Sequence, residues 1–367
     1  MTFGERMRQL MQEQDVSLRR LAKAVPCNVG YLSKVARDLG GPSEDLAKRL
    51  DELLGAGGEL AGLRRPPQRP TSVKAGDADR LRHAARKPLR VDPATVEALA
   101  RVLDGQRRLE DSVGSAAVLP AVRVQLKSIT SMVTEARGPI RNDLLDVAAQ
   151  WSQFGGWLYA SVGRPGDALK SLGRTLEWAT ESGNQQIVGE VLSWQGYVAE
   201  RRGQIGAMIG LSQAAQRLRA GSVGRVYDLY QEARALAAVG EADAVRRLTE
   251  QAAAAVVDVR PDVARPWEYY YFAPGFFVLE HGLAYRILGR TDPAYNAVAI
   301  EHLKAGLDGL PANMRASEWA GDFVYQLAMA YLQIGEAGEA ERVAADLETI
   351  ATRTGSDRLT GLLAALR

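Results

Sequence analysis

The sequence predicts an all-α protein in which a small N-terminal helical unit precedes a longer series of helical repeats. Apolar residues recur at three- and four-residue spacing along most of the 367 residues, and no stretch shows the period-two alternation of β-branched residues that is typical of strands. With 46% hydrophobic and 25% charged residues, the chain has enough apolar material for two or three domains. Disorder along most of its length is therefore excluded.

Composition also excludes several classes of protein. The longest apolar runs, such as residues 252–257, are well short of the roughly 20 residues that a membrane span requires. The first residues lack the basic tip and apolar core of a secretory signal. The single cysteine, Cys27, cannot form an internal disulfide, and the three histidines have no cysteine neighbours for a standard zinc site. We therefore expect a cytoplasmic protein without a metal or another cofactor.

Charge is distributed unevenly along the chain. The first 92 residues carry 18 Lys and Arg against 12 Asp and Glu, whereas the whole chain has a net charge of only +2. The N-terminal part is thus basic and the remainder is acidic. An anionic partner is therefore expected for the N-terminal part.

Four short helices are expected first, over residues 4–14, 17–25, 28–37 and 43–54. In the third, Leu32 and Val35 share one face, which we expect to join a core of Met7, Leu10, Leu21, Ala22, Leu46 and Leu50. The opposite face is small at its start and basic towards its end, and it carries Gly30, Ser33, Lys34 and Arg37. A helix that enters the major groove of DNA needs such a face, with little bulk and with donors that reach base edges.

The run from Ser17 to Val25, followed by Asn28 to Lys34 and later by Pro42 and Ser43, resembles the Xre (lambda-repressor-like) helix-turn-helix over about 55 residues. The resemblance implies that Ser17 and Asn28 cap the second and third helices and that Tyr31 reaches a phosphate. Direct base reading is expected to be sparse, because Val29 and Gly30 replace a polar pair and Pro26 replaces the usual turn glycine. The residues predicted to bind DNA are Ser17, Arg19, Arg20, Lys23, Asn28, Val29, Gly30, Tyr31, Ser33, Lys34 and Arg37.

Roles within this set differ. Val29 can meet a thymine methyl group, and Asn28 or Lys34 can pair with adenine or guanine. Arg19, Arg20 and Lys23 are placed for phosphates. The alternative is an ordinary solvated charged face. Cys27 has two interpretations, a buried small apolar residue or a redox switch.

Residues 64–91 are predicted to form a basic, proline-containing linker, with a short helix around residues 79–86. Its arginines at positions 64, 65 and 69 either follow DNA phosphates or keep the segment soluble. Regular helix resumes with Asp92 as N-cap and Pro93 at the first helical position, and the first helix is expected to end near Gln106.

A sequence pattern recurs from residue 156 onward: a small residue, an aromatic three positions later, a glycine four after that and an alanine five further on. It resembles the tetratricopeptide repeat, although the turn glycines are 37 to 49 residues apart against the usual period of about 34. We expect a tetratricopeptide-like solenoid over residues 92–367. The clear copies are Gly156, Tyr159, Gly163, Ala168; Gly282, Tyr285, Gly289, Ala294; and Ala328, Tyr331, Gly335, Ala340, with weaker ones around Gly203 and Gly240.

Aromatic residues cluster between positions 267 and 277, where 7 of the chain's 24 Trp, Tyr and Phe residues fall. Consecutive aromatics on a helix cannot all face one core, and Pro266 and Pro274 bracket the run. Packing between repeats, a ligand pocket and a dimer seam all remain open as explanations. The candidate ligand-binding residues are Trp267, Tyr270, Tyr271, Phe276 and Phe277.

Neither a phosphate-binding glycine loop nor a nucleophile near a histidine is apparent, so we expect no enzyme. The two-part architecture resembles that of Gram-positive peptide-sensing regulators and, more closely, of actinobacterial regulators. This resemblance implies a homodimeric regulator, a repressor by default, that binds a double-stranded DNA operator. Asparagines that would hold an extended peptide are not repeated along the solenoid, which favours a hydrophobic small molecule or a partner protein over a peptide. The alternative is a tetratricopeptide interaction scaffold in which the helix-turn-helix serves for docking.

Overall fold

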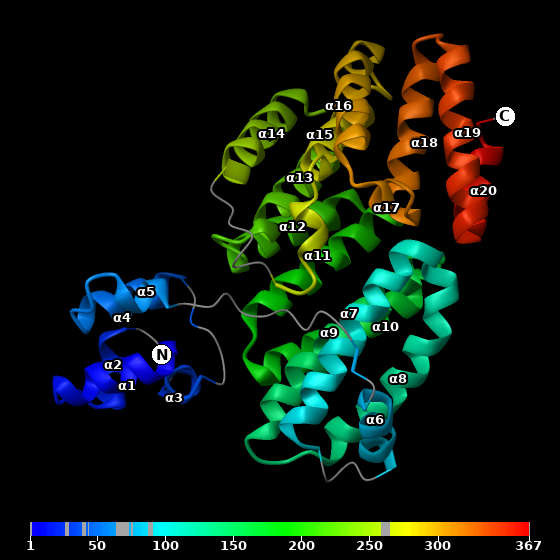
Figure 1. The fold of residues 1–367 in the computed structure, drawn as a ribbon. Helices are drawn as coiled ribbons and strands as arrows, with labels where there is room; N and C mark the ends of the chain where they lie inside the picture. The colour runs from blue at the N-terminus through cyan, green and yellow to red at the C-terminus, as the bar shows by residue number, and fades with distance from the viewer. Residues whose placement is uncertain are drawn as a thin grey trace. The chain divides into compact units, whose positions relative to one another are not determined.

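In a computed structural model of the chain, the residues described are 2–25, 29–38, 42, 44–63, 73–74, 76–86, 91–257 and 265–366. Every regular element within these ranges is a helix (Figure 1), which confirms the all-α prediction. The chain divides into two compact units, and the boundary falls between residues 69 and 70. None of the helices in the described ranges is long and apolar enough to cross a membrane.

The first unit contains five helices around one core. They are α1 (Phe3–Glu13), α2 (Leu18–Ala24), α3 (Val29–Ala36), α4 (Glu44–Leu53) and the short α5 (Glu59–Gly62). All eight residues predicted for the core are buried, and Phe3, Val25 and Leu54 join them. The amphipathic spacing therefore identified the buried face of each of the first four helices.

Side-chain caps fix how the helices of the first unit begin. The Thr2 side chain accepts a hydrogen bond from the Glu5 amide, and the Glu5 carboxylate accepts one from the Thr2 amide, which completes a capping box. The carboxylate of Asp38, just beyond α3, accepts hydrogen bonds from the Thr2 hydroxyl at 2.5 Å and from the Gly4 amide at 2.8 Å. These bonds tie the start of α1 to the end of α3.

The second unit begins with α6 (Asp77–Arg86), which corresponds to the short helix expected within the linker. It is packed onto α7 (Pro93–Val113) and α8 (Ser115–Glu135), because Leu81 and Ala84 are buried in the same core as residues of those helices. Arg101 of α7 also donates two hydrogen bonds to Asp77, at 2.7 and 2.9 Å. These bonds lower the pKa of Asp77 to about 2. Part of the expected linker is thus anchored to the second unit.

Helix α7 starts as expected and ends later than expected. Asp92 is the N-cap, since its carboxylate accepts a hydrogen bond from the Thr95 amide at 2.8 Å, and Pro93 is the first helical residue. The helix runs to Val113 and does not end near Gln106. Its last two turns carry charged residues that are buried by distant parts of the chain, which the local pattern does not reveal.

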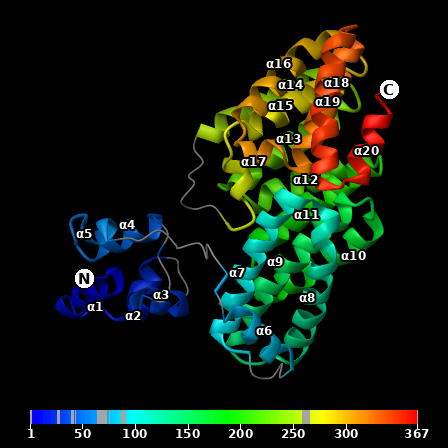
Figure 2. The ribbon, with the colours of Figure 1, turned by 45° about the vertical axis from the view of Figure 1, so that its right-hand side comes forward.

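Five helix pairs follow (Figures 1 and 2). In each pair a glycine of the recurring pattern stands between the two helices. The turn glycines are 163, 203, 240, 289 and 335. The pairs are α9 (Ile140–Ser161) with α10 (Pro165–Ser182), α11 (Gln185–Arg201) with α12 (Ile205–Leu218), α13 (Val223–Ala237) with α14 (Ala242–Val257), α15 (Phe276–Leu288) with α16 (Asn296–Gly309), and α18 (Glu318–Gln333) with α19 (Ala337–Thr354). Shorter elements are η3 (Tyr269–Phe272), η4 (Pro293–Tyr295), α17 (Ala312–Arg315) and α20 (Asp357–Ala364).

The first position of the pattern is small because the second helix of the pair crosses there. A Cβ atom on Gly156 would lie 3.0 Å from Leu172 of α10, and one on Gly282 would lie 2.9 Å from Leu303 of α16. Any larger residue would push the two helices of the pair apart. The small residue of the pattern therefore marks the point where the two helices of a pair pack closely.

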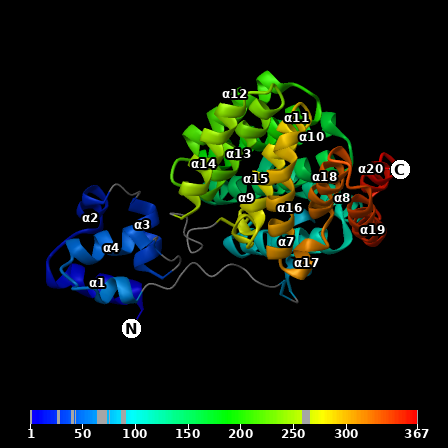
Figure 3. The same cartoon turned by 90° about the horizontal axis from the view of Figure 1, so that it is seen from above.

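The series of pairs closes on itself, because the start of the unit contacts its end. Helix α7 contacts α17 and α19. Figure 3 shows α17 beside α7 from above. The Ser115 amide donates a hydrogen bond of 2.9 Å to Glu318 of α18. Gly114, between α7 and α8, has a φ of 83°, and a Cβ there would lie 2.6 Å from the carbonyl oxygen of Thr354. The first helices of the pairs therefore surround a central space together with α7.

Candidate functional site

The first unit exposes a cationic face on α2. Arg19, Arg20 and Lys23 are all exposed, and none of them makes an ion pair with another residue in the described part of the chain. Ser17 caps this helix, as the resemblance implied, by accepting a hydrogen bond of 3.2 Å from the Arg20 amide. The N-terminus of α2 and three free cations thus lie on one helix, an arrangement that suits phosphate oxygens.

The predicted base-reading helix is α3, with Leu32 and Val35 buried on its inner side. Arg37 is exposed just beyond its end and Ser33 is half-buried within it. The Arg37 Nε donates a hydrogen bond of 3.2 Å to the Ser33 carbonyl oxygen. Asn28, Pro26 and Cys27 lie outside the described residues, as do the side chains of Val29, Tyr31 and Lys34 and the exposure of Gly30.

A family model described as a helix-turn-helix domain matches residues 2–63. The first unit is a helix-turn-helix domain. Its described helices, buried core and capped α2 fit the type of domain that DNA-binding regulators use. No curated protein matches the chain.

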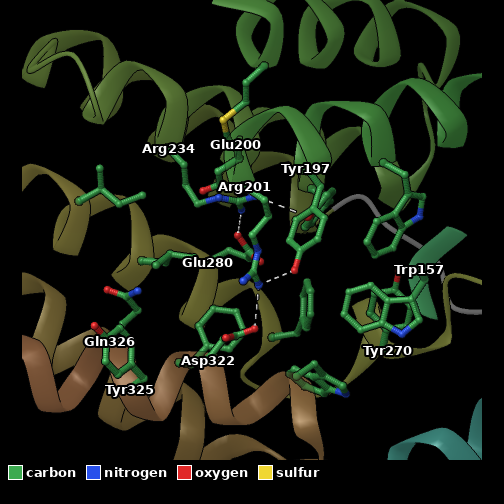
Figure 4. A pocket seen from close by; sticks show the side chains of 18 of the residues that line it. Trp157, Tyr197, Glu200, Arg201, Arg234, Tyr270, Glu280, Asp322, Tyr325 and Gln326 are labelled. Carbon is green, nitrogen blue, oxygen red and sulfur yellow. Dashed lines mark hydrogen bonds and ion pairs between the residues drawn. The ribbon is translucent and has the colours of Figure 1, made fainter. Parts of the chain in front are cut away.

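The second unit contains a cavity of about 450 Å³, within the size range of sites for small molecules. The first helices of all five pairs contribute to its wall, together with α7, η3 and α20. Figure 4 shows part of this wall from close by. Its lining includes Arg107, Glu110, Asp111, Gln153, Phe154, Trp157, Trp194, Tyr197, Glu200, Arg201, Met208, Tyr227, Arg234, Trp267, Tyr269, Tyr270, Phe276, Glu280, Arg290, Trp319, Asp322, Phe323, Tyr325 and Gln326.

One wall of the cavity is built from aromatic rings that come from separate repeats. The ring centroids of Trp157 and Trp194 are 5.0 Å apart, and those of Trp194 and Tyr197 are 5.4 Å apart in an edge-to-face arrangement. Tyr270 of η3 lines the same cavity, and Figure 4 labels it together with Trp157. Such walls favour flat apolar ligands, because they bury large areas and stack on ring faces.

Ion pairs cross the cavity between helices that are distant in sequence. Arg201 of α11 donates hydrogen bonds to the Tyr197 hydroxyl at 2.5 Å and to Asp322 of α18 at 3.1 Å, as Figure 4 shows. Arg234 of α13 pairs with Glu280 of α15 and, at 3.3 Å, with Glu200. These contacts connect the second, third, fourth and fifth helix pairs around the cavity.

Three charged residues of α7 face the cavity at three- and four-residue spacing. The Asp111 carboxylate accepts hydrogen bonds from the Tyr269 hydroxyl at 2.5 Å and from the Trp319 indole at 3.3 Å. Glu110 is 4% exposed, and burial beside the Asp111 carboxylate raises its pKa to about 8. Arg107 is 5% exposed, and burial lowers its pKa to about 10, so it remains charged near neutrality.

The aromatic run that the sequence singled out divides between the cavity and the packing behind it. Trp267, Tyr270 and Phe276 line the cavity, whereas Tyr271 and Phe277 do not. Tyr271 stacks on Tyr227 at 5.3 Å, and Phe277 stacks on Tyr230 at 5.9 Å. Packing between repeats, one of the three explanations left open, therefore occurs in this run, and three of its five candidate residues line a cavity.

Most of the lining escaped the sequence analysis. Arg107, Glu110 and Asp111 lie on one face of α7, as their spacing indicates, but charged residues at such spacing usually mark a solvated face. Trp157 and Trp194 are 37 positions apart in sequence and meet only because their helices are neighbours. The one usable signal was that both tryptophans belong to first helices of the repeat pattern.

Proposed function

We propose that the protein is a transcriptional regulator that binds a specific DNA operator as a homodimer and responds to a small molecule held in the cavity of its helical domain. The match of residues 2–63 to a helix-turn-helix domain carries the DNA-binding part of this proposal. Repression is the expected default. The helical domain is interpreted as tetratricopeptide-like, because it contains five helix pairs with a glycine in the turn and the first helix of each pair lines the cavity.

The experiment that tests this proposal is selection of genomic fragments by the full chain, followed by sequencing. A palindromic site with half-sites about one helical turn apart supports both specific binding and a dimer. Two half-sites are expected because a single domain of this size has a small footprint. If no sequence is enriched over random DNA, the regulator hypothesis is rejected, and the alternative of an interaction scaffold is favoured.

Lys34 is predicted to contribute to sequence preference, and Arg19 and Arg20 to affinity for any DNA. Lys34→Ala is expected to lower the preference for the operator by about 1 to 3 kcal/mol if Lys34 contacts a base edge in the major groove. Arg19→Ala or Arg20→Ala is expected to weaken operator and random DNA alike, because phosphate contacts carry no sequence information. Competition gel shifts at fixed salt measure both quantities. An equal loss for both DNAs in the Lys34 variant contradicts its role.

A small molecule is the favoured signal because the cavity is bounded by at least six helices and has the volume of a small-molecule site. A partner protein would need an open apolar surface. To shift the protein from mostly DNA-bound to mostly released, such a ligand needs about a 10⁴-fold preference for one state.

Helix α7 offers a direct route from the cavity towards the segment that leads to the helix-turn-helix domain. It carries Arg107, Glu110 and Asp111 at the cavity, and Arg101 of the same helix binds Asp77 of α6. A shift of α7 on ligand binding would therefore move α6, since the two are joined by buried apolar side chains and by a buried ion pair.

Tyr270 is the cavity residue best suited to test signal sensing. It is half-buried, whereas Phe276 is only 5% exposed and packs in a core with Tyr227 and Tyr271. Tyr270→Ala is expected to reduce the response to an inducing cell extract at least tenfold while operator affinity changes less than threefold, because an aromatic contact of the ligand is lost. Gel shifts titrated with extract measure this. Tyr295→Ala, outside the cavity, is the control, and loss of DNA binding by Tyr270→Ala contradicts the assignment.

A further inference from the structure

The carboxylates that line the cavity already have donors within the protein. Asp111 accepts from Tyr269 and Trp319, and Asp322 accepts from Arg201. Glu110 accepts a hydrogen bond of 2.6 Å from the Ser115 hydroxyl. The two remaining lining carboxylates, Glu200 and Glu280, pair with Arg234. Each of these carboxylates thus already has at least one hydrogen-bond or ion-pair partner within the protein.

The guanidinium groups that line the cavity differ from one another. Arg201 and Arg234 are paired with carboxylates, and Arg290 is exposed to solvent. Arg107 is 95% buried by contrast, and its Nη2 is a buried donor without a hydrogen-bond partner in the described residues. Its Cζ lies over the ring of Phe154, 5.9 Å from the ring centroid.

An unpaired buried guanidinium is costly unless something compensates its charge and its donors. The side chain of Gln153, which lines the same cavity and is 6% exposed, also makes no hydrogen bond with the described residues. The cavity thus contains a positive charge and N–H donors that no described residue uses, next to aromatic walls. A charged oxygen acceptor on an apolar ligand would use both features.

We propose that the cavity binds a flat, apolar monoanion, such as an aromatic acid, whose anionic oxygens pair with Arg107 and whose body lies against Trp157, Trp194 and Tyr270. This rests on the proposed function, because it names the chemical class of the signal. Charge selects the orientation of the ligand, and the aromatic walls supply most of the buried area. The ion pairs around Arg201 and Arg234 remain intact when the ligand binds.

Two dyes with the same aromatic body test the pairing with Arg107. Anilinonaphthalene sulfonate carries one anionic group, and phenylnaphthylamine lacks it. Of the six tryptophans, Trp157, Trp194, Trp267 and Trp319 line the cavity, so energy transfer from tryptophan to dye reports binding there. The full chain is expected to bind the sulfonate at least tenfold more tightly than the neutral dye.

Variants of the full chain separate charge pairing from other effects. Arg107→Met is expected to weaken sulfonate binding about 10- to 100-fold and to change phenylnaphthylamine binding less than threefold, since only the charge-assisted bonds are lost. Arg107→Lys is expected to retain most of the sulfonate affinity. Arg290→Met, which removes an exposed cation of the same lining, is expected to change neither dye more than threefold. Tyr270→Ala is expected to weaken both dyes.

Equal effects of Arg107→Met on both dyes, or no effect on either, overturn the proposal. Unchanged binding of both dyes to Tyr270→Ala also overturns it, because the dyes are then bound elsewhere. Gel shifts of the selected DNA fragment with and without the sulfonate dye test the regulator separately from the ligand class. If dye binding depends on Arg107 but does not change DNA binding, the ligand class is supported and the cavity has no role in signalling to the DNA-binding domain. Failure to select DNA rejects the regulator independently of the dye results.

Discussion

Replacing Gly224 with alanine is expected to destabilise the second unit by about 3 to 5 kcal/mol, because it removes a buried arginine from its partners. A Cβ on Gly224 would lie 1.4 Å from Nη2 of Arg219, which is 1% exposed. Arg219 lies 2.8 Å from Glu190 and 3.6 Å from Asp228, and both carboxylates are buried as well. Alanine must displace the guanidinium from its position beside two buried carboxyl groups, which weakens both ion pairs.

Gly210 provides a matched control for this substitution. It lies within α12, is exposed, and has no atom within 4 Å of the position of an added Cβ. Gly210→Ala is expected to be neutral or stabilising by up to about 1 kcal/mol, because alanine favours the helix. Urea unfolding followed by tryptophan fluorescence reports the second unit, which contains all six tryptophans. Similar midpoints for the two variants would contradict the packing around Arg219.

Replacing Glu110 with glutamine is expected to stabilise the protein at high pH and to leave it nearly unchanged at low pH. Burial raises the pKa of Glu110 to about 8 from 4.5. The folded state therefore holds this proton more tightly than the unfolded state does. The contribution of Glu110 to stability is complete below about pH 4.5 and is lost as the pH rises through 8. Glutamine cannot ionise and avoids this loss.

The expected gain for Glu110→Gln in the free energy of unfolding is about 2 to 5 kcal/mol at pH 9, and within about 1 kcal/mol of zero at pH 5. Denaturant unfolding between pH 5 and 9 measures it. Asp228 and Glu280 have pKa values that burial raises to about 7 and about 6, so the wild-type protein loses further stability over the same range. Glu177→Gln, on the exposed side of α10, is the control. Parallel pH profiles for wild type and Glu110→Gln would refute the prediction.

Local signals in the sequence were sufficient for the helix-turn-helix domain. Caps such as Ser17 and Asp92 act on amides three residues away, and amphipathic spacing identifies the buried face of each short helix. The domain is small, so its helices bury that face against near neighbours in sequence. The contribution of individual side chains such as Lys34 to DNA binding stays a prediction.

The cavity depended on the tertiary structure. Periodicity shows which face of α7 is distinct, but it does not show what covers that face. Arg107, Glu110 and Asp111 are buried because residues about 200 positions later in sequence, such as Trp319, close over them. The aromatic run contains both wall and packing residues, since a short 3₁₀ helix and a turn redirect side chains between Tyr269 and Phe276.

The sequence by itself thus determined the helical class, the helix-turn-helix domain and the glycine turns of the five helix pairs, all of which depend on contacts within one helix or between neighbours. Only the tertiary structure decided that the pairs close on themselves around a cavity and that Arg107 is buried there without an ion pair to any of the described residues. Closure depends on contacts such as that between Ser115 and Glu318, which are 203 residues apart. Contacts at such separation result from the summed angles between successive helix pairs, which no local pattern specifies.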